Sequence, residues 1–171
     1  MIKSDKKLKE LAALLAKDNN LLVSEAIRNL RSEEPFEGAV SLLVDLFDRT
    51  GDRIIHKTIE EFFNDIKDKS LRTEIITEIR KPWKGDTISM LVASCWQSGL
   101  DYSEFIKDFA TIFLKSDYPT SIECMTVIEE SVPHCSRNTK DAVIRYIEDS
   151  HLSGTNEKYG LTMELISILS K

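Results

Sequence analysis

The chain has 171 residues, of which 30% are Asp, Glu, Lys or Arg, and its formal net charge at pH 7 is −6. This length suits one domain with a substantial apolar core. General binding to nucleic acid requires a concentrated basic surface, so the acidic balance argues against that class of function.

The cysteines indicate a reducing compartment. Cys95, Cys124 and Cys135 form no CxxC pair and are odd in number, and the first two lie in apolar helical runs. A free cysteine in such a run behaves as a small hydrophobic residue. We therefore expect free thiols and a cytoplasmic location. The apolar residues 11–16 follow several lysines but are too few for a signal peptide, and Lys17 stands where a cleavage site would be.

Apolar residues at helical spacing predict four helices in the first part of the chain. We expect them near residues 4–17, from Ser24 to before Glu34, from Phe36 to Gly51, and from Asp52 to Ile66. In the last of these, Asp52 is predicted to be the N-cap.

The middle of the chain predicts two helices joined by a loop that contains Trp83. The first covers 71–80, and the second is the uncharged stretch Thr87–Leu100. Asp86 is the expected N-cap of this stretch and Gly99 its expected C-terminal stop. The stretch is shorter than the ~20 residues that a bilayer span needs, so it is typical of the central helix of a soluble helical protein.

Four more helices are expected near 102–115, 119–132, 138–150 and 156–170. Pro119 occupies a first-turn position, which is favourable for a helix start. No run of alternating β-branched residues with hairpin signals is present, so the sequence predicts an all-α protein of roughly ten helices.

The predicted helices recur in pairs. The first helices begin near Phe36, Leu71, Ser103 and Asn138, at separations of 35, 32 and 35 residues. A recurring helix pair of this length predicts a right-handed α-α superhelix in which each pair buries its apolar face against its neighbours. We expect a single domain over 1–171, with about five antiparallel helix pairs near 4–32, 36–67, 71–99, 102–132 and 138–170.

The segment Ser116-Asp-Tyr-Pro-Thr-Ser-Ile-Glu-Cys-Met-Thr-Val-Ile-Glu-Glu130 resembles the HEAT/armadillo class of repeats. A turn after one helix leads there into a second helix with small and apolar residues on its inner stripe. The tetratricopeptide and ankyrin patterns are absent. The resemblance implies an α-solenoid that serves as a protein-interaction scaffold, and it assigns no catalytic residue to this sequence.

The residues that carry chemistry elsewhere have no site-like spacing in this chain. His56, His134 and His151 lie far apart in sequence, and only His134-Cys135 places two metal-binding types together. We therefore expect no catalytic residue, no cofactor and no metal. Trp83, beside Pro82 and two lysines, is either an exposed binding anchor or, more often for such a residue, a plug at the end of the core.

Acidic and polar residues of the second helices are the better candidates for partner binding. In helical solenoids these helices often line the concave face. We expect a polar to acidic concave surface that receives a basic segment of another protein, although a merely solvated face explains the pattern equally well. The candidate partner-binding residues are Glu60, Glu61, Trp83, Gln97, Glu123, Glu129 and Glu130.

The sequence thus favours a non-enzymatic interaction module, such as an adaptor, an inhibitor or an immunity-type scaffold, that is monomeric or weakly dimeric. The main alternative is a HEAT-like DNA alkylpurine glycosylase or another nucleic-acid binder, which the acidic charge disfavours because a DNA groove needs many basic phosphate contacts. A third reading is a protein that binds membrane surfaces through Lys3, Lys6, Lys7 and Lys9. These lysines are better explained as the polar outer face of a terminal helix, so we expect no membrane contact.

Overall fold

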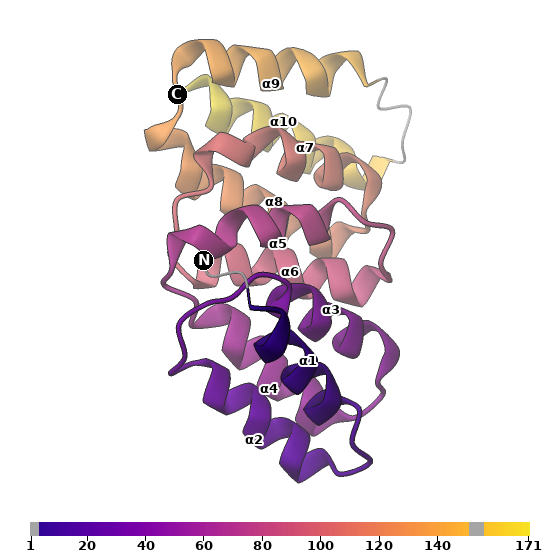
Figure 1. Ribbon diagram of the computed structural model, residues 1–171. Coiled ribbons are helices and arrows are strands. Elements are labelled where there is room, and N and C mark those ends of the chain that lie inside the picture. The colour runs from indigo at the N-terminus through magenta and orange to yellow at the C-terminus, as the bar shows by residue number, and fades with distance from the viewer. Residues whose placement is uncertain (1–3, 151–155) are drawn as a thin grey trace. The chain divides into compact units, whose positions relative to one another are not determined.

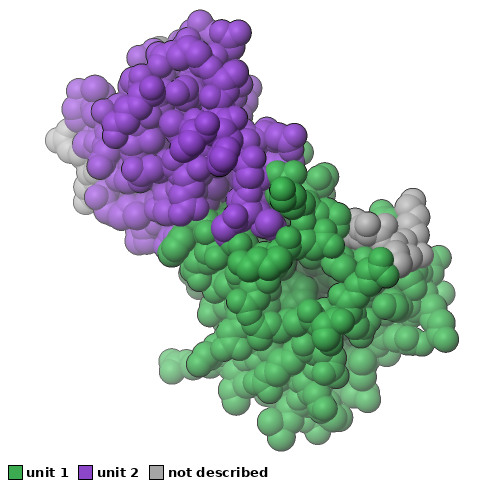
Figure 2. All heavy atoms as spheres, turned by 90° about the vertical axis from the view of Figure 1, so that its left-hand side faces the viewer, with its two compact units in different colours: residues 1–98 green, residues 99–171 purple. Residues whose placement is uncertain are grey.

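The computed structural model describes residues 4–150 and 156–171, and it is all-α as the sequence predicts (Figure 1). Within these two ranges the chain forms ten α-helices, three short 3-10 turns and no strand. None of the helices in the described part is long and apolar enough to cross a membrane. The helices belong to two compact units, residues 1–98 and residues 99–171 (Figure 2).

In the first unit, the helices form two layers. The helices α1, α3 and α5 contact one another in succession, and so do α2, α4 and α6. Between the layers lie side chains with no exposed surface, among them Val40, Leu43 and Ile59. The helices are α1 (Asp5–Leu15), α2 (Asn20–Leu30), α3 (Ala39–Arg49), α4 (Arg53–Asn64), α5 (Arg72–Ile79) and α6 (Gly85–Gln97), with a 3-10 turn at Lys69–Leu71 before α5.

The second unit repeats this plan with fewer helices. Its most extensive contact joins α7 and α8, while α9 packs on α7 and α10 packs on both α8 and α9. Tyr102 is buried in this unit, with its ring edge-on to Phe109 at a centroid distance of 5.9 Å. The elements are the 3-10 turn Ser103–Phe105, α7 (Ile106–Lys115), α8 (Tyr118–Ser131), the 3-10 turn Val132–His134, α9 (Arg137–Asp149) and α10 (Asn156–Ser170).

Two predicted helix starts in the first unit are wrong. The helix expected from Ser24 begins at Asn20, because the Asn19 side chain accepts hydrogen bonds from the first free backbone N–H groups, at 3.1 and 3.2 Å. The helix expected from Phe36 begins at Ala39, because Gly38 adopts a φ of +91° and turns the chain. Phe36 is still buried, but in the turn before α3.

The uncharged stretch forms α6, and its start also differs from the prediction. Asp86 is not the N-cap: the helix begins at Gly85 and its N-cap residue is Lys84, whose own side chain makes no capping hydrogen bond, so Asp48 of α3 takes over that role. One carboxylate oxygen of Asp48 accepts the Lys84 N–H at 3.0 Å and the Thr87 hydroxyl at 2.8 Å. The predicted stop is confirmed, since Gly99 follows the helix with a φ of +68°.

Three other side chains also close the ends of helices that are distant in sequence, and we call the four residues cross-caps. Glu74 of α5 accepts the Gly38 N–H at 3.0 Å, before α3 begins. Lys67 donates to the Ser98 carbonyl at 2.6 Å, at the end of α6. In the second unit, Lys158 donates to the carbonyls of Phe113 and Ser116 at the end of α7. The cross-caps, Asp48, Lys67, Glu74 and Lys158, satisfy backbone groups that a helix leaves unpaired at its ends.

Candidate binding groove and apolar pocket

An open depression of about 380 Å³ lies on the first unit, and we call it the α4–α6 groove. Three of its residues recur at four-residue intervals on α4, which places them on one face of that helix. Four more recur at intervals of three or four residues on α6, from Asp86 to Gln97, with Met90 beside them, and Phe47 of α3 completes the lining. The lining residues are Phe47, His56, Glu60, Asn64, Asp86, Ser89, Met90, Ala93 and Gln97.

The polar side chains of this groove are available for a partner. Within residues 4–150 and 156–171, the side chains of Glu60, Asn64, Asp86, Ser89 and Gln97 make no hydrogen bond or ion pair with other protein groups. No lysine or arginine lines the groove. Its two carboxylates therefore give it a negative charge that no lining cation balances.

His56 holds one end of the α4–α6 groove in place. Its Nε2 lies 3.0 Å from the Phe47 carbonyl and 2.9 Å from the Thr50 carbonyl. Both partners are acceptors, so Nε2 carries the hydrogen. The ring also stacks on Phe47, with centroids 4.1 Å apart and an interplanar angle of 18°. His56 thus fixes the turn between α3 and α4, and its role is structural.

The structure brings two of the predicted partner-binding residues together, since Glu60 and Gln97 line the same groove. Glu61 is exposed on α4 but is not part of this lining. On α8, in the second unit, Glu129 and Glu130 are exposed and Glu123 is half-buried. Sequence reasoning missed Asn64, Asp86 and Ser89, although the four-residue spacing of Asn64 from Glu60 is a signal that it shares the Glu60 face.

Trp83 is neither a fully exposed binding anchor nor a fully buried core residue. It is half-buried in the loop between α5 and α6, and its indole Nε1 is buried without a hydrogen-bond partner in the described part of the chain. The Lys81 ammonium group stands 5.7 Å from the centre of its ring, within the range of a cation–π contact. The ring therefore packs partly against the first unit and is partly accessible.

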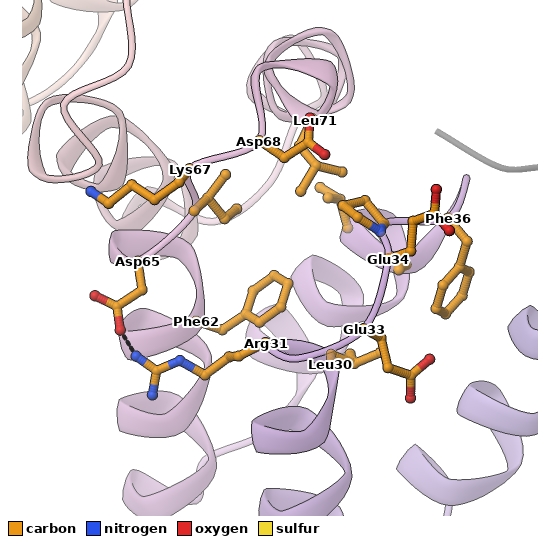
Figure 3. A pocket seen from close by; sticks show the side chains of 14 residues that line it. Leu30, Arg31, Glu33, Glu34, Phe36, Phe62, Asp65, Lys67, Asp68 and Leu71 are labelled. Atoms are coloured by element: carbon orange, nitrogen blue, oxygen red, sulfur yellow. Dashed lines mark ion pairs between the residues drawn. The ribbon is translucent and has the colours of Figure 1, made fainter.

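A second hollow, the apolar pocket, has a volume of about 280 Å³ and lies where α2 and α4 end (Figure 3). Sequence reasoning missed it, because its walls come from four separate elements whose apolar residues resemble ordinary core. Its apolar lining consists of Leu30, Pro35, Phe36, Ala39, Val40, Phe62, Ile66 and Leu71. Its charged lining consists of Arg31, Glu33, Glu34, Asp65, Lys67 and Asp68.

The two helices that end at the apolar pocket run parallel. Asn20 at the start of α2 donates to Asp52 at the start of α4, at 2.5 Å. Arg31 and Asp65, which directly follow α2 and α4, form an ion pair (Figure 3). Phe62 reaches into the hollow beside this pair. Both helices consequently direct their C-terminal ends, which carry partial negative charge, towards the pocket.

The cations of the apolar pocket are already engaged. Arg31 pairs with Asp65, and the Lys67 ammonium group donates to the Ser98 carbonyl at 2.6 Å. Among the acids, Glu33 accepts from Lys7 at 3.0 Å. Asp68 accepts the Ser70 N–H at 2.8 Å, and this backbone hydrogen bond holds the pKa of its carboxyl below the ordinary value. Among the described residues, four lining carboxylates against Arg31, Lys67 and the neighbouring Lys7 leave an excess of one negative charge at the pocket.

The described residues contain no group of three His, Cys, Asp or Glu side chains that could hold a metal ion. His134 is exposed and Cys135 half-buried in the turn before α9, while His151 lies outside the described residues. All three cysteines are free, and burial raises the pKa of the Cys135 thiol. A thiol with a raised pKa is a weaker nucleophile at neutral pH, so this position has no sign of catalytic activation.

Known proteins supply no assignment for this chain. No protein-family model matches it, and neither a curated protein nor a solved structure matches it.

Proposed function

We propose that this protein is a non-enzymatic protein-interaction module, and that the α4–α6 groove receives a basic segment of its partner. The observation that carries the proposal is the lining of the groove: two carboxylates and three neutral polar side chains, all without protein partners in the described ranges, and no lysine or arginine. Charged hydrogen bonds from Lys or Arg would match this set of acceptors.

The dimensions of the groove suit a short peptide segment. From Asp86 to Gln97 the groove follows α6 over about 16 Å at 1.5 Å per residue. An extended chain advances ~3.3 Å per residue, so about five residues fit along it. Met90, Ala93 and Phe47 supply apolar surface against which the methylene groups of lysine or arginine side chains can pack.

The proposed architecture is the HEAT/armadillo-like superhelix that the repeat spacing favours, with α4 and α6 among the second helices that line its inner face. The groove lies between these two helices, which agrees with the usual binding surface of such scaffolds. The free cysteines suit action in the cytoplasm. Phosphate groups would meet the carboxylates of Glu60 and Asp86, so the groove favours a basic peptide over DNA.

Selection from a random short-peptide display library tests this proposal. We expect the wild-type protein to enrich Lys- and Arg-rich peptides, and the double variant Glu60→Lys/Gln97→Lys to lose them. The double variant Glu25→Lys/Thr77→Lys is the matched control, because it adds the same charge at exposed positions outside both hollows. If the groove variant selects the same peptides as the control, the proposal is wrong.

The acidic residues of α8 are tested separately. The variant Glu123→Lys/Glu130→Lys alters the second unit and leaves the groove intact. Retention of the selected peptides by this variant would exclude α8 from the binding surface, whereas their loss would include it.

A further inference from the structure

The apolar pocket has the size and lining of a receptor for one large side chain. Its volume of about 280 Å³ is below the ~300–1,000 Å³ of typical small-molecule sites. Phe36, Val40 and Ile66 line it and are each at least 95% buried, so the walls are held firmly by the rest of the first unit. Binding anchors that fill such desolvated pockets are usually single aromatic or large side chains.

The surroundings of the pocket select for positive charge next to that side chain. Glu33, Glu34, Asp65 and Asp68 line the mouth, and the C-terminal ends of α2 and α4 add partial negative charge there. Three cations of the described part stand nearby and each is already engaged: Arg31 pairs with Asp65, Lys7 pairs with Glu33, and Lys67 is bound to the Ser98 carbonyl, so one negative charge remains in excess. A fatty acid or another anionic amphiphile would be repelled at this mouth.

From this charge complementarity we infer that the apolar pocket is a second binding site, which takes one large apolar side chain of a partner protein segment that has Lys or Arg on both sides of it. The inference rests on the proposed function only in that the partner is a protein. The site itself is separate, because no residue lines both the pocket and the α4–α6 groove.

A second copy of this chain is a poorer occupant. Its segment Lys81-Pro-Trp-Lys84 has the right composition, but the Trp83 Nε1 is buried and Lys84 is held by Asp48. Docking of this loop into another molecule would require the Trp83 ring to leave its packed position and the contacts between Lys84 and Asp48 to break. Self-association is therefore an outcome that the test must detect.

The experiment is a titration of the full-length, ¹⁵N-labelled protein with the capped peptide Lys-Lys-Trp-Lys-Lys, followed by amide chemical shifts. We expect saturable shifts at Phe36, Ala39 and Ile66. The peptide Lys-Lys-Gly-Lys-Lys should bind the pocket about tenfold more weakly, since it lacks the anchor. The peptide Glu-Glu-Trp-Glu-Glu should bind at least about fivefold more weakly, since its charge is wrong.

Variants locate the interaction on the protein. Glu33→Lys/Glu34→Lys should weaken binding of the Trp peptide about fivefold, and Asp18→Lys/Glu25→Lys, at exposed sites outside both hollows, should change it less than about twofold. Ala39→Leu fills the pocket and should abolish the pocket shifts. Because Ala39 is buried, circular dichroism checks that the Ala39→Leu variant folds. If it does not fold, the Glu33→Lys/Glu34→Lys variant still tests the inference.

The outcomes separate this inference from the proposed function. Equal pocket affinity for the Trp and Gly peptides, or shifts confined to the groove, would overturn the inference and leave the groove proposal standing. Shifts in the pocket that persist in Glu60→Lys/Gln97→Lys would support the inference even if the groove binds nothing. A concentration-dependent dimer that the Trp peptide dissociates would replace the partner segment with a second copy and also overturn it.

Discussion

Asp48 and Glu74 are carboxylates that meet the amino ends of helices other than their own, yet their surroundings move their pKa values in opposite directions. The pKa of Asp48 is held below its ordinary value, and the main cause is the hydrogen bond from the Thr87 hydroxyl. Burial raises the pKa of Glu74, and the nearby carboxylates of Glu37 and Glu78 add to the rise. The same structural role therefore makes opposite contributions to stability as pH changes.

Replacement of Asp48 should uncap α6. The variant Asp48→Ala removes the acceptor for the Lys84 N–H and the Thr87 hydroxyl, so we expect the free energy of unfolding to fall by about 1–2 kcal/mol, as for other lost helix caps. Urea denaturation followed by circular dichroism measures this. The control Asp45→Ala loses only an exposed ion pair with Arg49 and should cost less than about 0.5 kcal/mol. Equal losses in the two variants would contradict the capping role.

Glu74 should make the protein less stable as pH rises. Its folded-state pKa lies above the ordinary value of 4.5, so the folded state binds this proton more tightly than the unfolded state does. The associated stability is present below pH 4.5 and is lost as pH rises through the folded-state pKa. The variant Glu74→Gln keeps an oxygen for the Gly38 N–H but does not titrate.

Comparison of the unfolding free energies of wild type and Glu74→Gln at about pH 4 and about pH 7 checks this expectation. The difference should shift in favour of Gln at the higher pH. A difference that is the same at both values would show that burial of Glu74 does not govern its protonation.

At the scale of helices, the sequence predicted which segments are helical better than where they begin. The apolar spacing of Val40, Leu43 and Phe47 locates α3 because one face of the helix is fully buried. The start of α2 was misplaced because its first apolar residues, Leu21 and Leu22, are 77% and 42% exposed and do not belong to the buried stripe. There the Asn19 cap decides the start.

Gly38 supplies an element-scale test, because it sets where α3 begins. An added Cβ would combine a φ of +91° with a distance of 3.0 Å to the Leu8 side chain. We expect Gly38→Ala to destabilise the protein by about 1–2 kcal/mol, measured by thermal or urea unfolding. Gly85→Ala, in the first turn of α6 with open space around its Cβ position, is the control and should be neutral or slightly stabilising. A similar loss in both variants would refute the requirement for glycine at Gly38.

The candidate site was predictable only where it follows one helix face. Glu60 and Gln97 flank the apolar stripes of α4 and α6, so the sequence identified both as partner-facing residues, and they do line one groove. Asp86 was missed because its position before an apolar run is typical of an N-cap, and the real cap comes from Asp48, 36 residues before Lys84. The apolar pocket was missed for the same reason: its walls are assembled from residues that only the tertiary structure brings together.

At the scale of the whole molecule, the net charge of −6 should act on any basic ligand before it makes contact. We expect Lys-Lys-Trp-Lys-Lys to bind several-fold more weakly when ionic strength rises from about 0.02 M to 0.2 M, because screening shortens the range of the field. Isothermal titration calorimetry in a salt series measures the slope. An affinity independent of salt would mean that apolar contact alone drives binding, contrary to the charge argument for both sites.

The cross-caps also bear on how the chain folds as it leaves the ribosome. The N–H of Gly38 and the Glu74 side chain that satisfies it are 36 residues apart, and so are Lys84 and Asp48. A nascent chain that has emerged only as far as residue 70 contains all of α1–α4 but lacks the residue that closes the start of α3. The start of α3 and the end of α7 are therefore closed only after Glu74 and Lys158 have been synthesised, whereas α6 is closed by Asp48 and Lys67, which precede it. A fragment that ends before Glu74 should consequently be less stable than its own contacts suggest.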